Sequence, residues 1–373
     1  MSKQLITLTP LEPWFFGTDR TFKHPDRERQ RDGGYFIRSA DTPSQTTLFG
    51  VLRYLGIENP TANFSLTDEN KARIGNESFL LGKNNQDFGK IKSISPLYLL
   101  DDVDQFYVPV PLDHKVSKDH KWGEVQDYLP FKDYQFIETS QGQRVLPADY
   151  EEKGSLANGW MCLSDKKIYD DLFQGVTNIG IDKQKPEEAF FKRERKIFTP
   201  SDTKKPEKVT PNRFAFFADV DFDIPDERIV HLGQQKSAFW AKTEQIEPPE
   251  TEPHAVELKN GEKCETRKMS CLNENIAYVQ SDLFIEKPET LYAACKLVIV
   301  RLTTTRPFET IYGTGVANRY STRYNLLRLI QAGSIFWMND VETFKKAIKN
   351  EHAAIAGFNQ IIIGGKENEN SSL

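Results

Sequence analysis

The first 56 residues hold the feature that most restricts the fold, an apolar strand followed by a helix with a marked beginning. Residues 3–9 are predicted to form the strand, and residues 44–56 the helix. Thr42 or Ser44 can cap the helix, and Pro43 suits its first position if Thr42 is the cap. Apolar residues then recur at helical spacing, at Leu48, Val51, Leu52 and Leu55. This spacing predicts an apolar helix face that packs on a sheet.

The remaining pattern extends this beginning into an α+β fold. Further elements are expected as extended segments at 91–100 and 105–110, strands at 179–181, 212–222 and 237–241, and a short helix at 223–230. Strand–helix–strand–strand–helix–strand is the ferredoxin-like order found in RNA-recognition folds. A second such unit is expected from an apolar segment at 291–303, strands at 334–337 and 358–363, and a helix at 340–349.

We therefore predict two ferredoxin-like (RRM-like) domains. The first spans residues 1–243 and the second residues 291–373. Residues 244–290 are rich in Glu, Pro and polar residues, which indicates an acidic linker or loop. The tail after Lys366 is expected to be disordered.

Composition favours a soluble cytoplasmic protein. The chain has 373 residues and four scattered cysteines without CxxC spacing, which indicates reduced thiols. No apolar run approaches the roughly 18 residues that span a bilayer, and the N-terminus does not resemble a signal peptide. We expect no contact with a membrane.

Charge is distributed unevenly, although the net charge is only −5. Residues 183–213 contain ten Lys and Arg against five Asp and Glu, whereas residues 99–127 and 241–290 are acidic. Because screening limits a charge to about 8–10 Å, the local sign decides what a surface binds. The basic stretch suits RNA, and the acidic stretches are either surfaces for protein partners or solvated loops.

Three regions combine the cations, close backbone approach and aromatic faces that RNA binding requires. The first is the predicted helix start with nearby arginines: Arg20, Arg38, Ser44, Gln45, Thr46, Thr47 and Arg53. The second is a basic segment interleaved with Phe: Lys192, Arg193, Arg195, Lys196 and Phe198. The third consists of two glycine-bearing turns: Gly233, Gln234, Gln235, Lys236 and Ser237, and Gly357, Phe358 and Asn359. Arg319 and Arg323 add a basic patch near Tyr320.

Each region also has a purely structural explanation. The Phe side chains could pack the basic segment against the body, the glycines could serve simple turns, and Arg53 could be a solvated residue on a helix flank. The sequence gives little support for catalysis or metal binding. The histidines lack HxH or HExxH spacing, and Asp101–Asp104 lacks the glycine and distal Glu of a calcium loop. We predict no cofactor and no enzymatic activity.

Six short motifs occur along the chain in a characteristic order. They are PLEPWFFGTDRTF (10–22), PSQTTLFGVLR (43–53), VPVPLD (108–113), NIGID (178–182), LGQQKSAF (232–239) and AGFNQIIIGG (356–365). With these motifs, the chain resembles the third Cmr subunit of type III-B CRISPR effector complexes, a family within the RAMP superfamily of guide-RNA-binding proteins. It departs from that family at Asn178, where an Arg is usual, and at residues 233–236, where a Gly-Gly-Glu-x-Arg loop is usual.

The resemblance implies a non-catalytic subunit for RNA-guided antiviral defence. Such a subunit binds the 5′ repeat-derived handle of the CRISPR RNA. It also docks the large polymerase-like signalling subunit and the first of the backbone RAMP subunits. In that family a projecting hairpin wedges into the guide RNA as a thumb, and the resemblance assigns this role to residues 183–211.

Two alternatives remain open at this point. Related folds include metal-independent endoribonucleases that process repeat RNA, and such chemistry needs a general base near the 2′-hydroxyl. His24 and Tyr35 would be the pair available for it. The other alternative is the equivalent handle-binding subunit of a type III-A or III-D complex.

Overall fold

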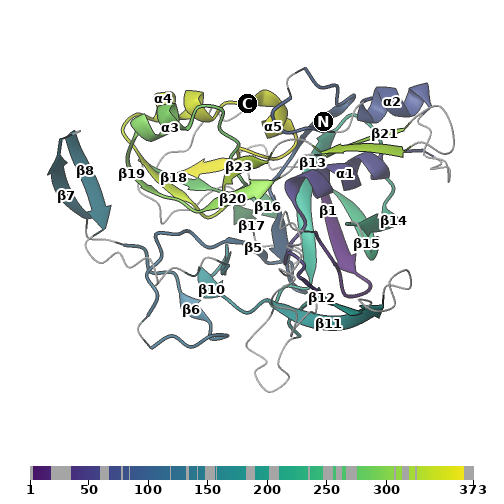
Figure 1. Ribbon diagram of the computed structural model, residues 1–373, viewed down its shortest axis with the longest axis horizontal. Coiled ribbons are helices and arrows are strands. Elements are labelled where there is room, and N and C mark those ends of the chain that lie inside the picture. The colour runs from purple at the N-terminus through teal and green to yellow at the C-terminus, as the bar shows by residue number, and fades with distance from the viewer. Residues whose placement is uncertain are drawn as a thin grey trace, which may run out of the picture.

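The chain forms a mixed α+β structure with mostly antiparallel sheets and few helices (Figure 1). The computed structural model describes residues 3–17, 35–58, 67–76, 79–83, 85–117, 119–131, 134–140, 142–147, 156, 158–181, 190–200, 210–233, 236–246, 255–257, 263–265, 275–305, 308–312, 319–323 and 326–364. Within this part of the chain, no helix combines the length and the apolar character needed to cross a membrane.

The largest sheet contains ten strands, in the order β14-β15-β1-β13-β4-β5-β9-β10-β6, with β3 paired to β13 beside β4. Its strands are β1 (Lys3–Pro10), β3 (Ile91–Ile94), β4 (Tyr98–Leu100), β5 (Phe106–Pro109), β6 (Gln126–Asp127), β9 (Trp160–Cys162), β10 (Lys167–Tyr169), β13 (Arg213–Val220), β14 (Glu227–Leu232) and β15 (Ser237–Ile246). β1 lies between β13 and β15 and is antiparallel to both. Ile6 and Leu8 of β1 face one side of the sheet, whereas Leu5 faces the other, as the alternation of strand side chains requires.

Helix α1 (Gln45–Leu55) covers the side of the sheet on which Ile6 and Leu8 lie. Ser44 is the N-cap, and its side chain accepts a hydrogen bond from the Thr47 N–H. Leu48, Leu52 and Leu55 are almost completely buried against the sheet. The short helix α2 (Asp68–Ile74), capped by Thr67, adds Ile74 to the same core. The structure therefore contains the helix that the cap and the apolar spacing of the sequence predict.

A second, four-stranded sheet has the order β19-β24-β18-β25. It is formed by β18 (Ile276–Val279), β19 (Cys295–Ile299), β24 (Ile335–Met338) and β25 (Ile361–Ile363). Helices α3 (Pro288–Ala293) and α4 (Val341–Ile348) lie over one face of it (Figure 1), where Leu291, Phe344 and Ile348 join its core. The following helix, α5 (Glu351–Ile355), instead contributes Ala353 to the core beneath α1.

The two sheets share a core, so that helix α1, the two sheets and helices α3 and α4 form successive layers. Leu5 and Ala215 from the first sheet pack in one cluster with Ile276, Tyr278 and Ile335 from the second. The Tyr278 hydroxyl donates a hydrogen bond to the Pro109 carbonyl at 2.5 Å. The VPVPLD motif (108–113) thus lies at the junction of the two halves.

A turn of the second half fits closely against this motif. The Leu112 N–H donates to the Gly333 carbonyl at 2.8 Å. Gly333 has a φ of +92°, and a Cβ at this position would lie 2.7 Å from the Val110 carbonyl oxygen. A side chain is therefore excluded here both by the backbone conformation and by space.

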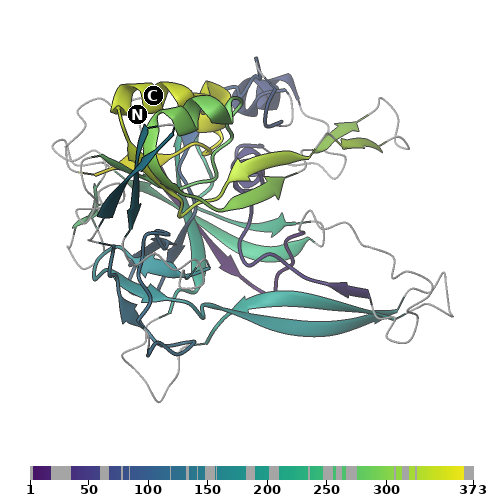
Figure 2. The same ribbon diagram turned by 60° about the vertical axis from the view of Figure 1, so that its left-hand side comes forward.

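Further antiparallel strand pairs lie outside these two sheets. They are formed by β7 (Tyr134–Thr139) with β8 (Gly142–Pro147), β11 (Phe173–Ile181) with β12 (Phe190–Phe198), β16 (Ala255–Glu257) with β17 (Lys263–Glu265), β20 (Leu302–Thr305) with β23 (Leu327–Ile330), and β21 (Phe308–Tyr312) with β22 (Arg319–Arg323). Figure 2 shows β11 and β12 as a long hairpin that projects from the body. Strand β2 (Tyr35–Ile37) pairs in parallel with β12.

Most of the expected elements are confirmed, with two corrections. The predicted helix at 223–230 is wrong, because Glu227–Leu232 is a strand paired with β15. Ile276–Val279 falls in the predicted linker but is a fully buried strand between β24 and β25. The expected disordered tail after Lys366 lies outside the described residues.

Two glycine substitutions should affect stability in opposite directions. Gly333→Ala should lower the free energy of unfolding by about 1–3 kcal/mol, because alanine is strained at this φ and meets the Val110 carbonyl. Gly50→Ala, on the exposed side of α1 with no atom within 4 Å of its Cβ, should raise it by about 0.5–1 kcal/mol. Urea unfolding of both variants checks this, and equal effects would contradict the close fit at Gly333.

Asp113 should make stability depend on pH. Burial raises the pKa of Asp113 to about 6, although Tyr128 donates a hydrogen bond to its Oδ1 at 2.9 Å. The folded chain therefore holds this proton more tightly than the unfolded chain, so the contribution of Asp113 to stability falls as the pH rises from about 4 to about 6. Asp113→Asn keeps the acceptor and cannot titrate. Its stability relative to the natural chain should rise across this window by no more than about 3 kcal/mol.

Chemical unfolding at several pH values measures this difference directly. The neighbouring His114, whose pKa burial lowers to about 4, is present in both chains and cancels in the comparison. A difference that stays constant between pH 4 and pH 7 would show that Asp113 does not take up a proton on folding.

Candidate nucleic-acid interface

Residues 12–16, which follow β1, form the centre around which the predicted RNA-binding regions gather; we call them the Trp14 segment. Trp14 is fully buried, and its ring centroid lies 5.0 Å from that of Phe198 and 5.3 Å from that of Phe214. Its backbone exchanges two hydrogen bonds with Lys196 of β12, of 2.9 and 2.8 Å. Its indole Nε1 donates to the Asp41 carbonyl at 3.0 Å. Through its ring, its backbone and its indole N–H, Trp14 thus connects the first sheet, the β11–β12 hairpin and the chain leading into α1.

Strand β12 places two arginines beside this segment. The Arg193 guanidinium lies 5.7 Å from the centroid of the Phe15 ring. Arg195 approaches Glu12 at 3.6 Å and donates to the Pro13 carbonyl at 3.4 Å. Burial, and then the positive charge of Arg195, lower the pKa of Arg193. Two like charges so close together favour an anion between or beside them.

Lys196 has carboxylate partners inside the protein. Its Nζ lies 2.8 Å from Glu194 and 3.1 Å from Asp41. Although burial acts to lower the pKa of Lys196, these two carboxylates raise it overall. Lys196 therefore ties β12 to the chain before α1, and Phe198 packs in the aromatic cluster around Trp14.

The first glycine-bearing turn also contacts Phe15. The buried Ser237 hydroxyl accepts a hydrogen bond from the Phe15 N–H at 3.1 Å. Gly233 has a φ of +72°, and a Cβ there would lie 2.4 Å from the Phe15 carbonyl oxygen. Lys236, exposed at the tip with a φ of +52°, donates its N–H to the Gly233 carbonyl. Gln234 and Gln235 lie outside the described residues.

The start of α1 is joined to the same segment through residues 39–41. The Phe16 N–H donates to the Ser39 hydroxyl at 2.8 Å, and the Ala40 N–H donates to the Phe16 carbonyl at 2.9 Å. Arg38 is exposed just before this contact. Ser44 then caps α1, with the hydroxyls of Thr46 and Thr47 within 2.9 and 3.0 Å of its own. The exposed helix start presents hydroxyl groups and the positive end of the helix dipole.

The second glycine-bearing turn also reaches α1, but its contact is internal. A Cβ on Gly357 would lie 2.0 Å from Nε2 of Gln45, which donates to the Ser95 carbonyl at 2.7 Å. Phe358 is buried and stacks on Phe79 at 5.8 Å. The Asn359 side chain bonds to backbone groups of residues 284 and 348. These groups hold the second half of the chain against α1 and its surroundings.

Other predicted residues lie apart or outside the description. Arg53 is at the far end of α1, where it donates to the carbonyls of Ile74 at 3.0 Å and Gly75 at 3.1 Å, and burial lowers its pKa. The structure describes the strands that carry Lys192, Arg319 and Arg323 but not these side chains. Arg20 and His24 lie outside the described residues, and of Tyr35 only the strand is described.

Sequence reasoning missed Phe15, Ser39 and Asp41, which contact the predicted regions directly. The signal was present, since an aromatic run after the first strand forms part of the first motif. Among the described residues, no three His, Cys, Asp or Glu side chains gather where a metal ion could be held.

Comparison with known proteins identifies the family. A family model described as CRISPR-associated protein (Cas_Cmr3) matches residues 6–197, just over half of the chain. The chain belongs to the Cas_Cmr3 family. This confirms the resemblance drawn from the motifs, four of which lie wholly or largely within the matched region. No curated protein matches the sequence.

Two solved structures with a similar course of the chain are of the Type III-B Cmr-beta assembly. One is a chain from "Cryo-EM structure of the Type III-B Cmr-beta bound to cognate target RNA", with a TM-score of 0.48, 14% identity and coverage of 97% of this chain and 98% of that chain. The other comes from the same assembly with AMPPnP, state 1, with a TM-score of 0.47, 14% identity and coverage of 96% and 95%. The assignment to the Cas_Cmr3 family rests on the family model.

Removing the Ser237 hydroxyl should destabilise the contact at Phe15. Ser237→Ala leaves the buried Phe15 N–H without its acceptor, which should lower the free energy of unfolding by about 1–3 kcal/mol. Thr46→Ala, at an exposed hydroxyl on α1, should change it by no more than about 0.5 kcal/mol. Thermal and urea unfolding of the two variants give the comparison. Similar values for both would mean that the turn is not held by Ser237.

Proposed function

We propose that this chain is a non-catalytic subunit of a type III-B CRISPR ribonucleoprotein that binds the 5′ repeat-derived handle of the CRISPR RNA. The observation that carries the proposal is that strand β12 and the Gly233–Ser237 turn both contact the Trp14 segment, β12 at the Trp14 backbone and the turn at the Phe15 N–H. The first brings Arg193 and Arg195, and the second brings Ser237. Membership of the Cas_Cmr3 family supports the same conclusion.

Different residues around the Trp14 segment can bind different phosphates of a single-stranded RNA. Arg193 and Arg195 supply positive charge for phosphates, and Lys236 supplies a further exposed cation on a glycine-bearing turn. The capped start of α1 offers hydroxyls and the helix dipole to another phosphate. Lys196 and Phe198 support this surface from inside, and Gln45, Phe358 and Asn359 hold the second half of the chain against α1. Arg53 lies at the far end of α1 and is not part of the surface. Of the RNA-binding set predicted from the sequence, we therefore retain the residues assigned here to the phosphates, namely Arg193, Arg195, Lys236 and the hydroxyl groups at the start of α1.

The proposed fold consists of two ferredoxin-like units and a thumb. The orders β15-β1-β13-β3 and β25-β18-β24-β19 both correspond to the 4-1-3-2 arrangement of a ferredoxin-like sheet. In the first unit α1 follows the first strand, and β14 occupies the place of the second helix along the chain. The second unit begins at β18. The projecting β11–β12 hairpin (Figure 2) is the proposed thumb, so the thumb includes residues before the range 183–211 expected from the sequence.

The proposed partners are the CRISPR RNA, the large polymerase-like signalling subunit and the backbone RAMP subunits. Both solved structures named above are of a type III-B Cmr assembly bound to cognate target RNA. The same role would apply in a type III-A or III-D complex, and the subunits that assemble with the chain distinguish these cases.

Charge reversal at Arg193 should weaken RNA retention. In a complex reconstituted with CRISPR RNA, Arg193→Glu should lower the RNA affinity and reduce the slope of log affinity against log salt by about 0.7, the value for one phosphate contact on a single strand. Lys296→Glu, an equal charge change at an exposed position of β19, is the control and should leave both quantities unchanged. Filter binding at several salt concentrations measures the affinity and the slope.

Two results would contradict the proposal. One is a complex that retains full-length CRISPR RNA equally with Arg193→Glu and with Lys296→Glu. The other is cleavage of repeat RNA by the purified chain without metal, since a non-catalytic subunit leaves the strand intact.

A further inference from the structure

Strand β14 ends the large sheet and leaves one side of its backbone without a partner strand among the described residues. The Asp226 carbonyl accepts a hydrogen bond from the Thr243 N–H at 2.7 Å. In the regular antiparallel alternation, Arg228 and Val230 then bond inward to β15, while Glu227, Ile229 and His231 direct their N–H and C=O groups outward. An exposed edge of this kind is a template for another strand.

Three large apolar side chains lie exposed across the edge strand and the two strands next to it, and we call Leu11, Ile229 and Trp240 the edge patch. Their exposed fractions are 52%, 56% and 45%. Ile229 lies directly opposite Trp240, so their side chains share a face of the sheet. Leu11 continues from β1 and donates its N–H to the Ala238 carbonyl, two residues from Trp240. Contiguous exposed apolar side chains of this size mark interaction sites.

The edge patch continues a face that is covered elsewhere. Trp240 lies opposite Thr9 on β1, and Glu244 opposite Leu5, so the patch is on the side of the sheet to which Leu5 points. At Leu5 that side is packed against the second sheet. The second sheet covers the face at β1 and leaves Trp240 and Ile229 exposed.

The charge around the patch favours a protein rather than RNA. Glu227 lies opposite Lys242, and Lys242 is already paired with Glu244 at 2.8 Å. Asp223 and Asp226 are exposed just before β14. Negative charge therefore predominates, which repels phosphates and attracts basic side chains.

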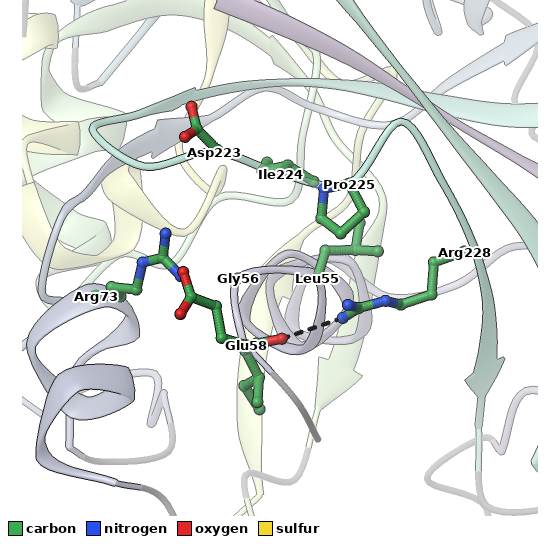
Figure 3. Close-up of a pocket in the computed structure, with 9 residues that line it drawn as sticks. Leu55, Gly56, Glu58, Arg73, Asp223, Ile224, Pro225 and Arg228 are labelled. Carbon is green, nitrogen blue, oxygen red and sulfur yellow. Dashed lines mark hydrogen bonds and ion pairs between the residues drawn. The ribbon is translucent and has the colours of Figure 1, made fainter.

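The other side of β14 fixes the strand to the body. Figure 3 shows Arg228 reaching from β14 toward the end of α1, across a pocket of about 220 Å³ lined also by Leu55, Arg73 and Pro225. Its guanidinium donates to the carbonyls of Tyr54 at 3.3 Å and Ile57 at 3.2 Å and lies over the Tyr54 ring. Because β14 is already held in place, it loses little conformational freedom when a segment pairs with it.

We propose that β14 receives an extended segment of another protein subunit as an added antiparallel strand. The segment places an apolar side chain beside Ile229, on the face that also carries Trp240, and a Lys or Arg near Glu227. Backbone hydrogen bonds to Ile229 give the affinity, and the alternate side chains give the specificity. The inference rests on the proposed function in one respect, namely that the partner is another subunit of the ribonucleoprotein.

Hydrogen–deuterium exchange of the full chain tests the pairing directly. The free chain, the chain with CRISPR RNA alone, and the reconstituted complex with the large and backbone subunits are compared. We expect amide exchange in peptides covering residues 227–231 to slow at least tenfold in the complex and to remain unchanged with RNA alone. Slowing with RNA alone, or in the free chain at higher concentration, would identify RNA or a second copy as the occupant and would overturn the proposal.

Matched substitutions test the side chains. Ile229→Lys should weaken assembly with the partner subunit at least tenfold and leave RNA retention unchanged. Leu302→Lys, at a similarly exposed apolar residue of β20 (58% exposed), should change neither. Ile229→Pro removes an outward N–H that would bond to the added strand, so it should also weaken assembly. The variant should still fold, because edge strands tolerate proline at such positions. If Ile229→Pro does not fold, the exchange experiment on the natural chain still decides.

The outcomes separate the two proposals. A complex that assembles and retains RNA with unchanged exchange at residues 227–231 overturns the docking edge and leaves the proposed function in place. A natural chain that neither retains RNA nor assembles with the subunits overturns both.

Discussion

The burial of Trp14 is the constraint on which the surrounding structure depends. Its ring packs with aromatic residues of β11, β12, β13 and β15, its backbone pairs with β12, and its indole N–H reaches Asp41. A large aromatic ring with one polar atom can satisfy all of these requirements at once, because it fills the core while the N–H finds an acceptor. The projecting hairpin, the first sheet and the approach to α1 are thereby fixed relative to one another.

The sequence predicted correctly those helices whose caps and apolar spacing lie within a few neighbouring residues. The cap and apolar spacing of α1, and Asp340 with Phe344 and Ile348 in α4, needed no knowledge of distant residues. Strand β14 was mistaken for a helix because Asp223 resembles a cap and is followed by acidic residues. Its pairing with β15 and the burial of Val230 against the core outweigh that preference. Strand β18 was missed because four buried residues within a long polar tract leave too short a pattern.

The candidate site shows a similar division. Its regions were found because basic, aromatic and glycine residues cluster in the sequence, but the sequence could not tell surface groups from supporting ones. Lys196 meets Asp41 and Glu194, and Arg53 meets the carbonyls at the end of α2, through contacts that form only when distant segments come together. Phe15 was overlooked for the same reason, since its importance comes from the two elements that converge on it.

The contact between Gly357 and Gln45 has a consequence for how the two halves of the chain can be studied. Ala356 and Phe358 belong to the same core as Leu48 of α1, although more than 300 residues of sequence separate them. A fragment ending after β15 would lose these residues and would also expose Leu5 and Ala215 to water. The halves are therefore expected to melt in a single cooperative transition, and deletion of either one is a poor way to isolate its contribution.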